Sequence, residues 1–221
     1  MPKDGESSES IEPSSSSTDS GEDIPPLPAI ANVIAFLQPE YVTRGTHALI
    51  YKVSVEDSKG KLTICLKLFR KDSISSYNRE VEAYARLRAD GVGFCIPKVL
   101  GCGSRTVSGW GLEEVDGDRD GTYFGILMEW LEGAETVSEH NITNGQAQCL
   151  VIGLQRIHDL EIIHNDLQFC NMMVIPGTDR GVILDFSCAR LGTDREIEQE
   201  IAIGGRLPLG LVTSPRRFFL R

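Results

Sequence analysis

The chain has 221 residues, of which 41% are hydrophobic, and a formal net charge of −10. This length suffices for one large domain or two small lobes with a packed core. No apolar run approaches the ~20 residues of a membrane-spanning helix. No stripe of basic residues is present that would bind nucleic acid. We therefore expect no membrane and no nucleic-acid partner.

The N-terminal segment 1–28 combines serines, prolines and acidic residues without a hydrophobic pattern. Such a segment buries too little apolar surface to offset its ordering entropy, so we expect it to be disordered. It resembles neither a secretory signal nor an arginine-rich transit peptide. The six cysteines are scattered without a C-x-x-C pair. These features indicate reduced thiols in a cytoplasmic or nuclear protein.

After a short apolar stretch at 29–37, two antiparallel strands are predicted at 45–53 and 62–69, joined by a turn at 57–61. Side-chain alternation puts Cys65, Lys67 and Phe69 on one face of the second strand. A lysine inside an apolar strand needs an acidic partner. The alternative is an exposed lysine on an edge strand, whose long side chain reaches water.

A helix is predicted at 76–88, ending before Gly91. Its i, i+4, i+7 spacing places Glu80, Tyr84 and Leu87 on the inward face, whereas Glu82 points away. Glu80 is therefore the glutamate of this helix that is expected to face the core.

The middle of the chain alternates strands, a loop and a helix. We expect a strand at 96–101, a surface loop at 104–121 and a strand at 123–129. Thr143 and Gln146 form a capping box that begins a helix running to His158. A further helix is predicted at 194–203. His158 and His164 are interpreted as structural hydrogen-bonding residues, because no third zinc ligand follows their spacing.

Polar residues flank two short apolar strands that are predicted to form a hairpin, 172–174 and 182–184. Asp166 and Asn171 lie in the loop before the first strand, and Asp185 follows the second. A hairpin brings these three side chains together. Two carboxylates and an amide suit a hard cation and a reacting hydroxyl group.

These patterns resemble the protein-kinase-like superfamily, closest to its fungal, atypical and aminoglycoside-phosphotransferase-like members. Asp166 precedes Asn171 by five residues, as in the family's catalytic loop, and Asp185-Phe186 matches the start of its metal-binding turn. The resemblance implies an α+β fold with two lobes. These are an antiparallel-sheet N-lobe with its hinge at 29–133 and a shortened, mainly helical C-lobe at 134–221.

The resemblance also implies an ATP- and Mg²⁺-dependent phosphotransferase. Lys67, held by Glu80, would contact the phosphates, and Asp166 would accept the proton of the acceptor hydroxyl. The implied Mg²⁺ ligands are Asn171 and Asp185. The implied nucleotide contacts are a phosphate-covering loop with Gly45, Cys65 above the adenine, and backbone groups around Glu129 and Leu131.

Three features depart from the family pattern. Asn165 replaces an arginine, Ser187 replaces a glycine, and Gln168 stands where protein Ser/Thr kinases commonly have lysine. The first and third favour an atypical or small-molecule kinase. The acceptor, a protein or a small molecule, stays open. The alternative function is a pseudokinase or truncated protein that binds nucleotide or a partner without catalysis, favoured by the thin glycine loop and the short C-lobe.

Overall fold

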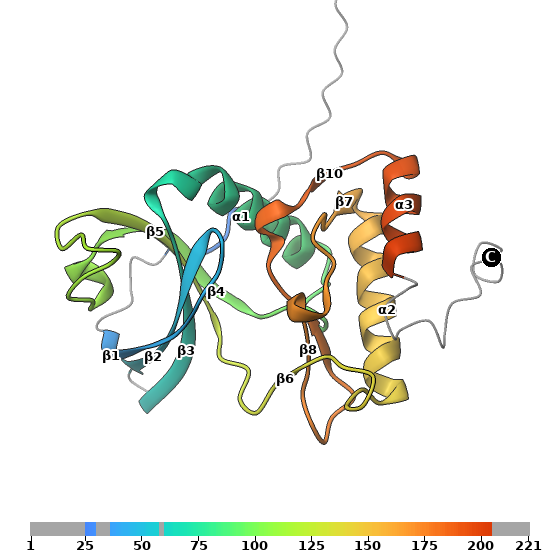
Figure 1. The fold of residues 1–221 in the computed structure, drawn as a ribbon, viewed down its shortest axis with the longest axis horizontal. Coiled ribbons are helices and arrows are strands. Elements are labelled where there is room, and N and C mark those ends of the chain that lie inside the picture. The colour runs from blue at the N-terminus through green and yellow to red at the C-terminus, as the bar shows by residue number, and fades with distance from the viewer. Residues whose placement is uncertain (1–24, 30–35, 58–59, 205–221) are drawn as a thin grey trace, which may run out of the picture.

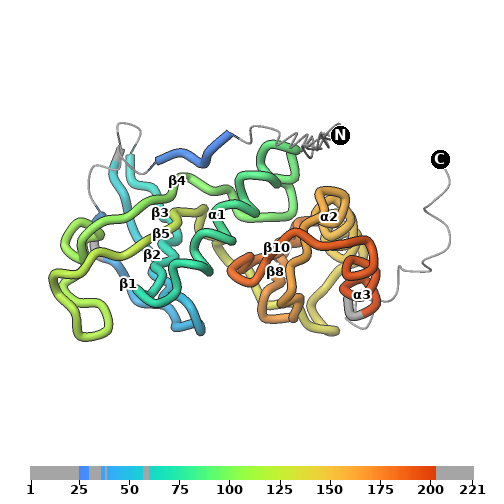
Figure 2. Tube along the Cα trace, turned by 90° about the horizontal axis from the view of Figure 1, so that it is seen from above, coloured from blue at the N-terminus to red at the C-terminus, as the bar shows by residue number. Residues whose placement is uncertain are grey.

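The computed structural model describes residues 25–29, 36–57 and 60–204, which form a mixed α+β fold. A curled antiparallel sheet has the strand order β1 (Phe36–Arg44), β2 (Ala48–Asp57), β3 (Gly60–Phe69), β5 (Thr122–Glu129) and β4 (Val99–Thr106). Helix α1 (Ile74–Ala89) lies between this sheet and the rest of the molecule, as the two views show (Figure 1, Figure 2).

The second half of the described chain, which we call the helical part, contains α2 (Asn144–Asp159) and α3 (Asp194–Gly204). Five short strands accompany them: β6 (Glu135–Thr136), β7 (Ile162–Ile163), β8 (Met172–Val174), β9 (Gly181–Ile183) and β10 (Arg190–Leu191). They form one sheet ordered β6-β8-β9 and one pair, β10-β7. Short 3₁₀ turns are η2 (Lys71–Ser73), η3 (Ser108–Trp110), η4 (Phe169–Asn171) and η5 (Phe186–Cys188).

Most of the predicted elements are confirmed, because local signals specify them. The Thr143 hydroxyl accepts from the Gln146 amide at 3.2 Å, and the Gln146 side chain accepts from the Thr143 amide at 3.0 Å, so the capping box begins α2. Helix α1 buries Glu80 completely, whereas Glu82 pairs with Arg86 on the exposed face. The periodicity of α1 therefore identified its inward carboxylate correctly.

The two faces of β3 belong to different hydrophobic clusters. Leu66 and Leu68 pack with Trp110 on the outer side of the sheet. Phe69 packs on the other side, in a cluster that continues through α1 to α2 and β9. Because β3 is the central strand, the edge-strand interpretation of Lys67 is wrong; the residue is only 5% exposed.

Three predictions near the sheet need correction. In the segment predicted as a surface loop, 104–121, the first three residues instead end β4, and Trp110 in η3 is completely buried. Strand β1 was not predicted, and the strand expected at 96–101 begins at Val99. The predicted disorder of 1–28 fails at its end, where Leu27 is buried and Pro28 accepts a hydrogen bond from Cys102. Residues 1–24 lie outside the described residues. Buried apolar residues such as Leu27 and Trp110, which follow no helix or strand spacing, give no periodicity from which to infer their packing.

Within the described residues, every helix is too short or too polar to span a bilayer.

Trp110 should be a large contributor to the stability of the sheet. Its Nε1 donates to the Tyr123 carbonyl at 3.1 Å, and its ring lies so close to Gly125 that a Cβ there would come within 2.6 Å of it. We expect Trp110→Ala to lower the free energy of unfolding by about 3–5 kcal/mol in urea titrations. Leu62→Ala, at a 49% exposed position, should cost less than about 0.5 kcal/mol. Equal losses would contradict this assignment.

Candidate functional site

One buried ammonium group joins three elements that are distant in sequence. Lys67 of β3 donates to Glu80 Oε2 of α1 at 2.6 Å and to Asp185 Oδ1, after β9, at 2.7 Å. Strand alternation places Lys67 on this face of β3, and helix periodicity places Glu80 on the facing side of α1. The turn after β9 supplies the other carboxylate. The structure therefore brings together Lys67, Glu80 and Asp185 as the sequence predicts.

The electrostatics of this triad follow from burial and proximity. Burial alone lowers the pKa of Lys67, but Glu80 and Asp185 together raise it above its ordinary value, so the ammonium stays charged. Burial raises the pKa of Glu80 to about 7, against the lowering effect of Lys67. Burial also acts to raise the pKa of Asp185, but Lys67 and Ser187 lower it to about 2. Asp185 is therefore the firmly ionised partner.

The turn after β9 places Asp185 by means of a left-handed backbone. Asp185 has φ 63°, a conformation that costs energy in a residue other than glycine. The Phe186 ring next to it lies against the rings of Tyr84 and His164, with centroid distances of 5.1 and 4.9 Å. Ser187 has no positive φ, so its side chain adds no left-handed strain in place of glycine.

The loop before β8 fixes Asp166 with two amide side chains. Asn171 Nδ2 donates to Asp166 Oδ2 at 2.9 Å, and Gln168 Nε2 donates to Asp166 Oδ1 at 2.5 Å. The loop is joined to the strand that leads to Asp185, because the Leu184 amide donates to the Asn171 carbonyl at 2.8 Å. The predicted proximity of Asp166, Asn171 and Asp185 thus has a backbone cause.

His164 has the structural role that the sequence predicts. Its Nε2 lies 2.8 Å from the Leu184 carbonyl, and its Nδ1 accepts from the Asp166 amide at 3.3 Å. Burial lowers the pKa of His164, which favours the neutral ring. The ring therefore holds the loop next to β9.

Sequence reasoning missed Glu200, a 6% exposed carboxylate on α3. Glu200 accepts from the backbone amides of His164 at 3.0 Å and Asn165 at 2.6 Å, and it lies 2.9 Å from His158 Nε2. Asn165 has φ 62°, so these bonds hold a left-handed residue immediately before Asp166. The i, i+4 relation of Glu196 and Glu200 on an amphipathic helix was the available signal, but it does not indicate which backbone amides they meet.

Besides Lys67, four residues were predicted to contact a nucleotide, and they lie in different surroundings. Gly45 forms the turn between β1 and β2, where its amide donates to the Ala48 carbonyl at 2.8 Å and an added Cβ would fit. Cys65 shares the Lys67 face, and burial raises its thiol pKa to about 12, so it is an unreactive packing group. Leu131 accepts from the Ala134 amide at 3.2 Å in the segment after β5.

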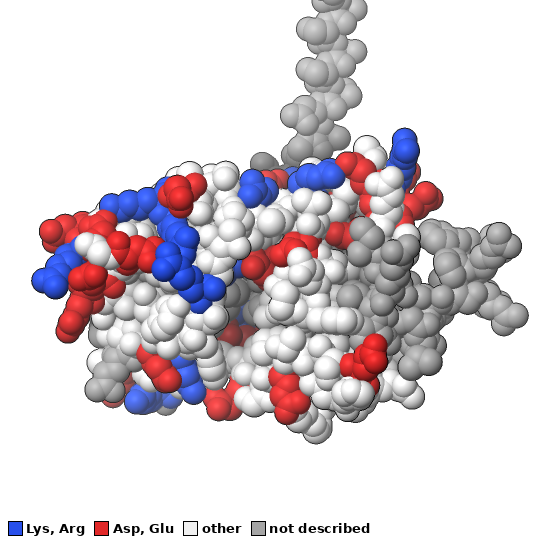
Figure 3. All heavy atoms as spheres, in the orientation of Figure 1, with Lys and Arg blue, Asp and Glu red and all other residues white. Residues whose placement is uncertain are grey.

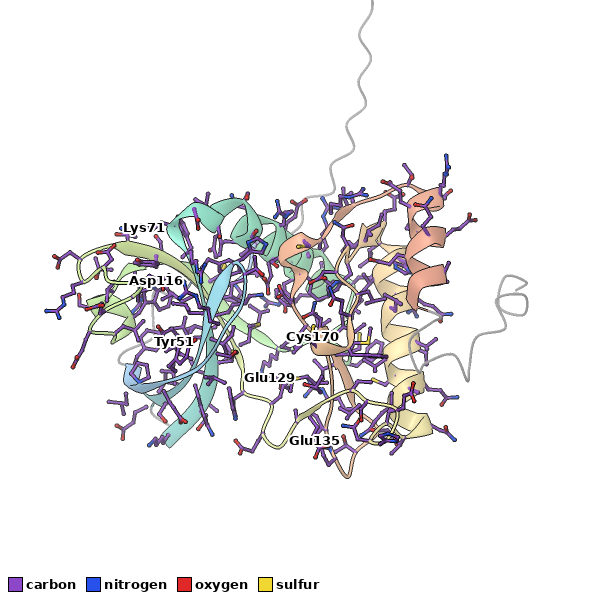
Figure 4. All side chains as sticks on the ribbon, in the orientation of Figure 1. Tyr51, Lys71, Asp116, Glu129, Glu135 and Cys170 are labelled. Atoms are coloured by element: carbon purple, nitrogen blue, oxygen red, sulfur yellow. The ribbon has the colours of Figure 1, made fainter. Side chains whose placement is uncertain are left out.

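Glu129 has a side-chain partner that the sequence does not indicate. Its carboxylate binds the guanidinium of Arg180, in the turn between β8 and β9, and accepts from the Lys98 amide at 2.8 Å. Figure 4 shows Glu129 where the chain leaves the sheet for the helical part. Arg180 also donates to the Ile96 carbonyl at 3.2 Å. This ion pair therefore joins the end of β5 to the turn between β8 and β9.

The donor set near the triad is small. No group of three or more His, Cys, Asp and Glu side chains with metal-binding geometry occurs in the described part of the chain. Asp185 and Asn171 offer one carboxylate and one amide, the number of protein ligands that Mg²⁺ commonly takes when phosphates and waters complete its shell. The surface between the sheet and the helical part is hollowed, with charged atoms visible inside it (Figure 3).

No protein-family model matches the chain, and no curated protein matches it. The functional argument therefore depends on the residues that the structure brings together.

Because Asp185 is ionised in the folded protein, the stability of the fold should depend on pH. Its folded pKa of about 2 lies below the ordinary 3.8, so its contribution to stability is present above about pH 4 and is lost as the pH falls to about 2. Because its side chain is 38% exposed, we expect Asp185→Asn to cost only about 1 kcal/mol at pH 6. Urea titrations should show this difference vanishing between about pH 4 and 2. Asp179→Asn, at an exposed position, is the matched control.

Glu200 should stabilise the loop around Asp166. Glu200→Ala leaves two backbone amides without their acceptor, so we expect a loss of roughly 1–3 kcal/mol in the free energy of unfolding. Hydrogen exchange at His164 and Asn165 should accelerate more than exchange in β3. Glu198→Ala, at an exposed position on the same helix, is the matched control. Unchanged exchange at both amides would contradict the role of Glu200.

Proposed function

We propose that the chain is an ATP- and Mg²⁺-dependent phosphotransferase with a two-lobed, protein-kinase-like fold. The observation that carries the proposal is the lysine between two carboxylates, Lys67 with Glu80 at 2.6 Å and Asp185 at 2.7 Å. The same turn region adjoins the loop with Asp166 and Asn171 through the Leu184 amide. An ion pair that only stabilised the fold would not need the Asp166 loop, with its fixed carboxylate, next to it.

The side chains fit the needs of phosphoryl transfer, which are mainly positioning and charge neutralisation. Lys67 would turn its ammonium from Asp185 to the phosphates, while Glu80, fully buried on α1, keeps the lysine in place. Asp166 would accept the hydrogen bond and then the proton of the acceptor hydroxyl. Gln168 and Asn171 orient that carboxylate from opposite oxygens.

The residues also fit a magnesium ion. Asn171 uses its Nδ2 on Asp166, and no hydrogen bond from the described residues reaches its Oδ1, so this oxygen is available as a ligand. Asp185 supplies a carboxylate held ionised. Mg²⁺ bound there would neutralise charge on the phosphates.

The second candidate is a pseudokinase that binds nucleotide without turnover. Gly45 favours it, because the residue lacks a positive φ and a Cβ would fit there, so the turn has no special need for glycine. The hydrogen bonds that already occupy both oxygens of Asp166 favour it too. The ionised Asp185 and the paired Lys67 favour catalysis, and we therefore place the phosphotransferase first.

Nucleotide binding should depend on the triad. Saturating ATP with Mg²⁺ should stabilise the protein by about 2.7 kcal/mol at a hundredfold excess over Kd, seen as a rise in Tm. Lys67→Met and Asp185→Asn should abolish the rise, whereas Lys61→Met, at an exposed position on the same strand, should retain it. Circular dichroism and titration with a fluorescent ATP analogue separate lost binding from lost folding. Binding unaffected by both triad variants would refute the proposal.

Catalysis should depend on Asp166. Asp166→Asn should keep ATP binding but lower phosphate transfer or ATP hydrolysis by about 10²–10⁴-fold, because it removes the proton acceptor. Release of labelled phosphate from γ-labelled ATP measures this. ATP binding without turnover in the unmodified chain would instead establish the pseudokinase.

A further inference from the structure

We infer that the pocket between the Asp166 loop and α3 binds the phosphate acceptor, and that this acceptor is a small polyhydroxylated molecule without negative charge. The inference rests on the proposed phosphotransferase and adds its substrate class. The pocket has a volume of about 330 Å³. This is the size at which small-molecule sites begin, and it suits a monosaccharide-sized compound better than a folded partner.

The pocket has two walls that meet at the proposed base. The Asp166 loop forms one wall, and β10 with α3 forms the other. Glu200 holds the walls together through its bonds to the amides of His164 and Asn165. The two walls therefore enclose a space that suits a small molecule better than a peptide chain.

The two carboxylate oxygens of Asp166 face different sites, one the pocket and the other the proposed magnesium site. Its Oδ2 accepts from Asn171, which does not line the pocket, and its Oδ1 accepts from Gln168, which does. A hydroxyl group that replaces the Gln168 amide would therefore reach Oδ1 from the pocket side. This places the acceptor oxygen next to the base and leaves Asn171 for the metal.

The charges around the pocket exclude an anionic acceptor. Asp166, Glu196 and Glu200 line it against one cation, Arg190, which is already paired with Glu196 at 2.6 Å. A phosphate or carboxylate on the acceptor would meet this excess of negative charge without a free cation among the lining residues.

The uncharged groups of the pocket suit hydroxyl groups. Its amides, Asn165, Gln168 and Gln199, each offer both donors and acceptors, as a polyol requires. Leu167 and Ile163 supply apolar contact for the C–H face of a sugar ring. The pattern is therefore that of a polyol site.

The reaction at this site is balanced with ATP as the donor. The acceptor oxygen forms a bond to the γ-phosphorus, and the bond from that phosphorus to the β,γ-bridging oxygen breaks, so ADP leaves with the electron pair. The hydroxyl proton passes to Asp166. The products are ADP and a phosphate monoester.

Binding of defined probes to the full chain tests the inference. Saturation-transfer NMR would use neutral polyols (myo-inositol and glucose), glucosamine and glucose 6-phosphate, with and without Mg²⁺ and a non-hydrolysable ATP analogue. We expect at least one uncharged or amino-bearing probe to bind, and glucose 6-phosphate to bind at least about tenfold more weakly. The comparison of glucose with glucosamine distinguishes neutral from cationic acceptors.

Variants on α3 assign the binding to this pocket. Gln199→Ala should weaken polyol binding about fivefold, the effect of one hydrogen bond, while Glu198→Ala leaves it unchanged. Gln199→Arg should improve binding of glucose 6-phosphate relative to glucose.

The outcomes separate this inference from the proposed function. Nucleotide binding without binding of any polyol would overturn the inference alone, as would phosphorylation of dephosphorylated casein that is insensitive to Gln199→Ala. Preferred binding of glucose 6-phosphate would overturn it too. Absence of nucleotide binding would instead count against the phosphotransferase, and the nucleotide-free NMR experiment would still decide whether the pocket takes a polyol.

Discussion

The charge of Lys67 is the constraint that organises the rest of the structure. An ammonium in the central strand of a sheet is costly to remove from water unless carboxylates compensate it. Glu80 and Asp185 do so from α1 and from the turn after β9, so one side chain fixes the helix against the sheet and the helical part against both. The unequal exposure of the two carboxylates gives them different roles. In the proposed function, the buried Glu80 would remain with the lysine and the more exposed Asp185 would be available to a ligand.

A second set of contacts joins the Lys67 triad to the loop of the proposed base, Asp166. Leu184 links the strand before Asp185 to both ends of the Asp166 loop, through Asn171 and His164. Glu200 then binds the same loop from α3. The strained backbone at Asn165 and Asp185 is therefore held by hydrogen bonds on every side, which is how left-handed residues persist at functional sites. In the proposed reaction, these successive contacts would hold the phosphates, the base and the acceptor pocket next to one another.

The hydrophobic periodicity of the chain predicted its regular elements well, and its isolated apolar residues poorly. Helix α1 and strand β3 follow spacing rules that assign each residue to a face, so Glu80 and Lys67 were placed correctly from local pattern. Trp110 and Leu27 lie outside any periodic apolar pattern in the sequence, yet both are buried. Their burial depends on the partner surface, the outer face of the sheet for Trp110 and the main core for Leu27, and no local pattern reports that surface.

The sequence by itself determined the chemistry available to the site: a lysine on a strand face, an inward glutamate on a helix, and an aspartate, asparagine and aspartate around a hairpin. Each follows from spacing of a few residues, where backbone geometry alone decides which side chains share a face. Only the tertiary structure decided the partners contributed by remote segments. Arg180 for Glu129, Glu200 for the Asp166 loop, and the pocket beside α3 arise from contacts between residues 35 to 51 positions apart. Such pairings depend on how whole elements pack, and that information is absent from any short stretch of sequence.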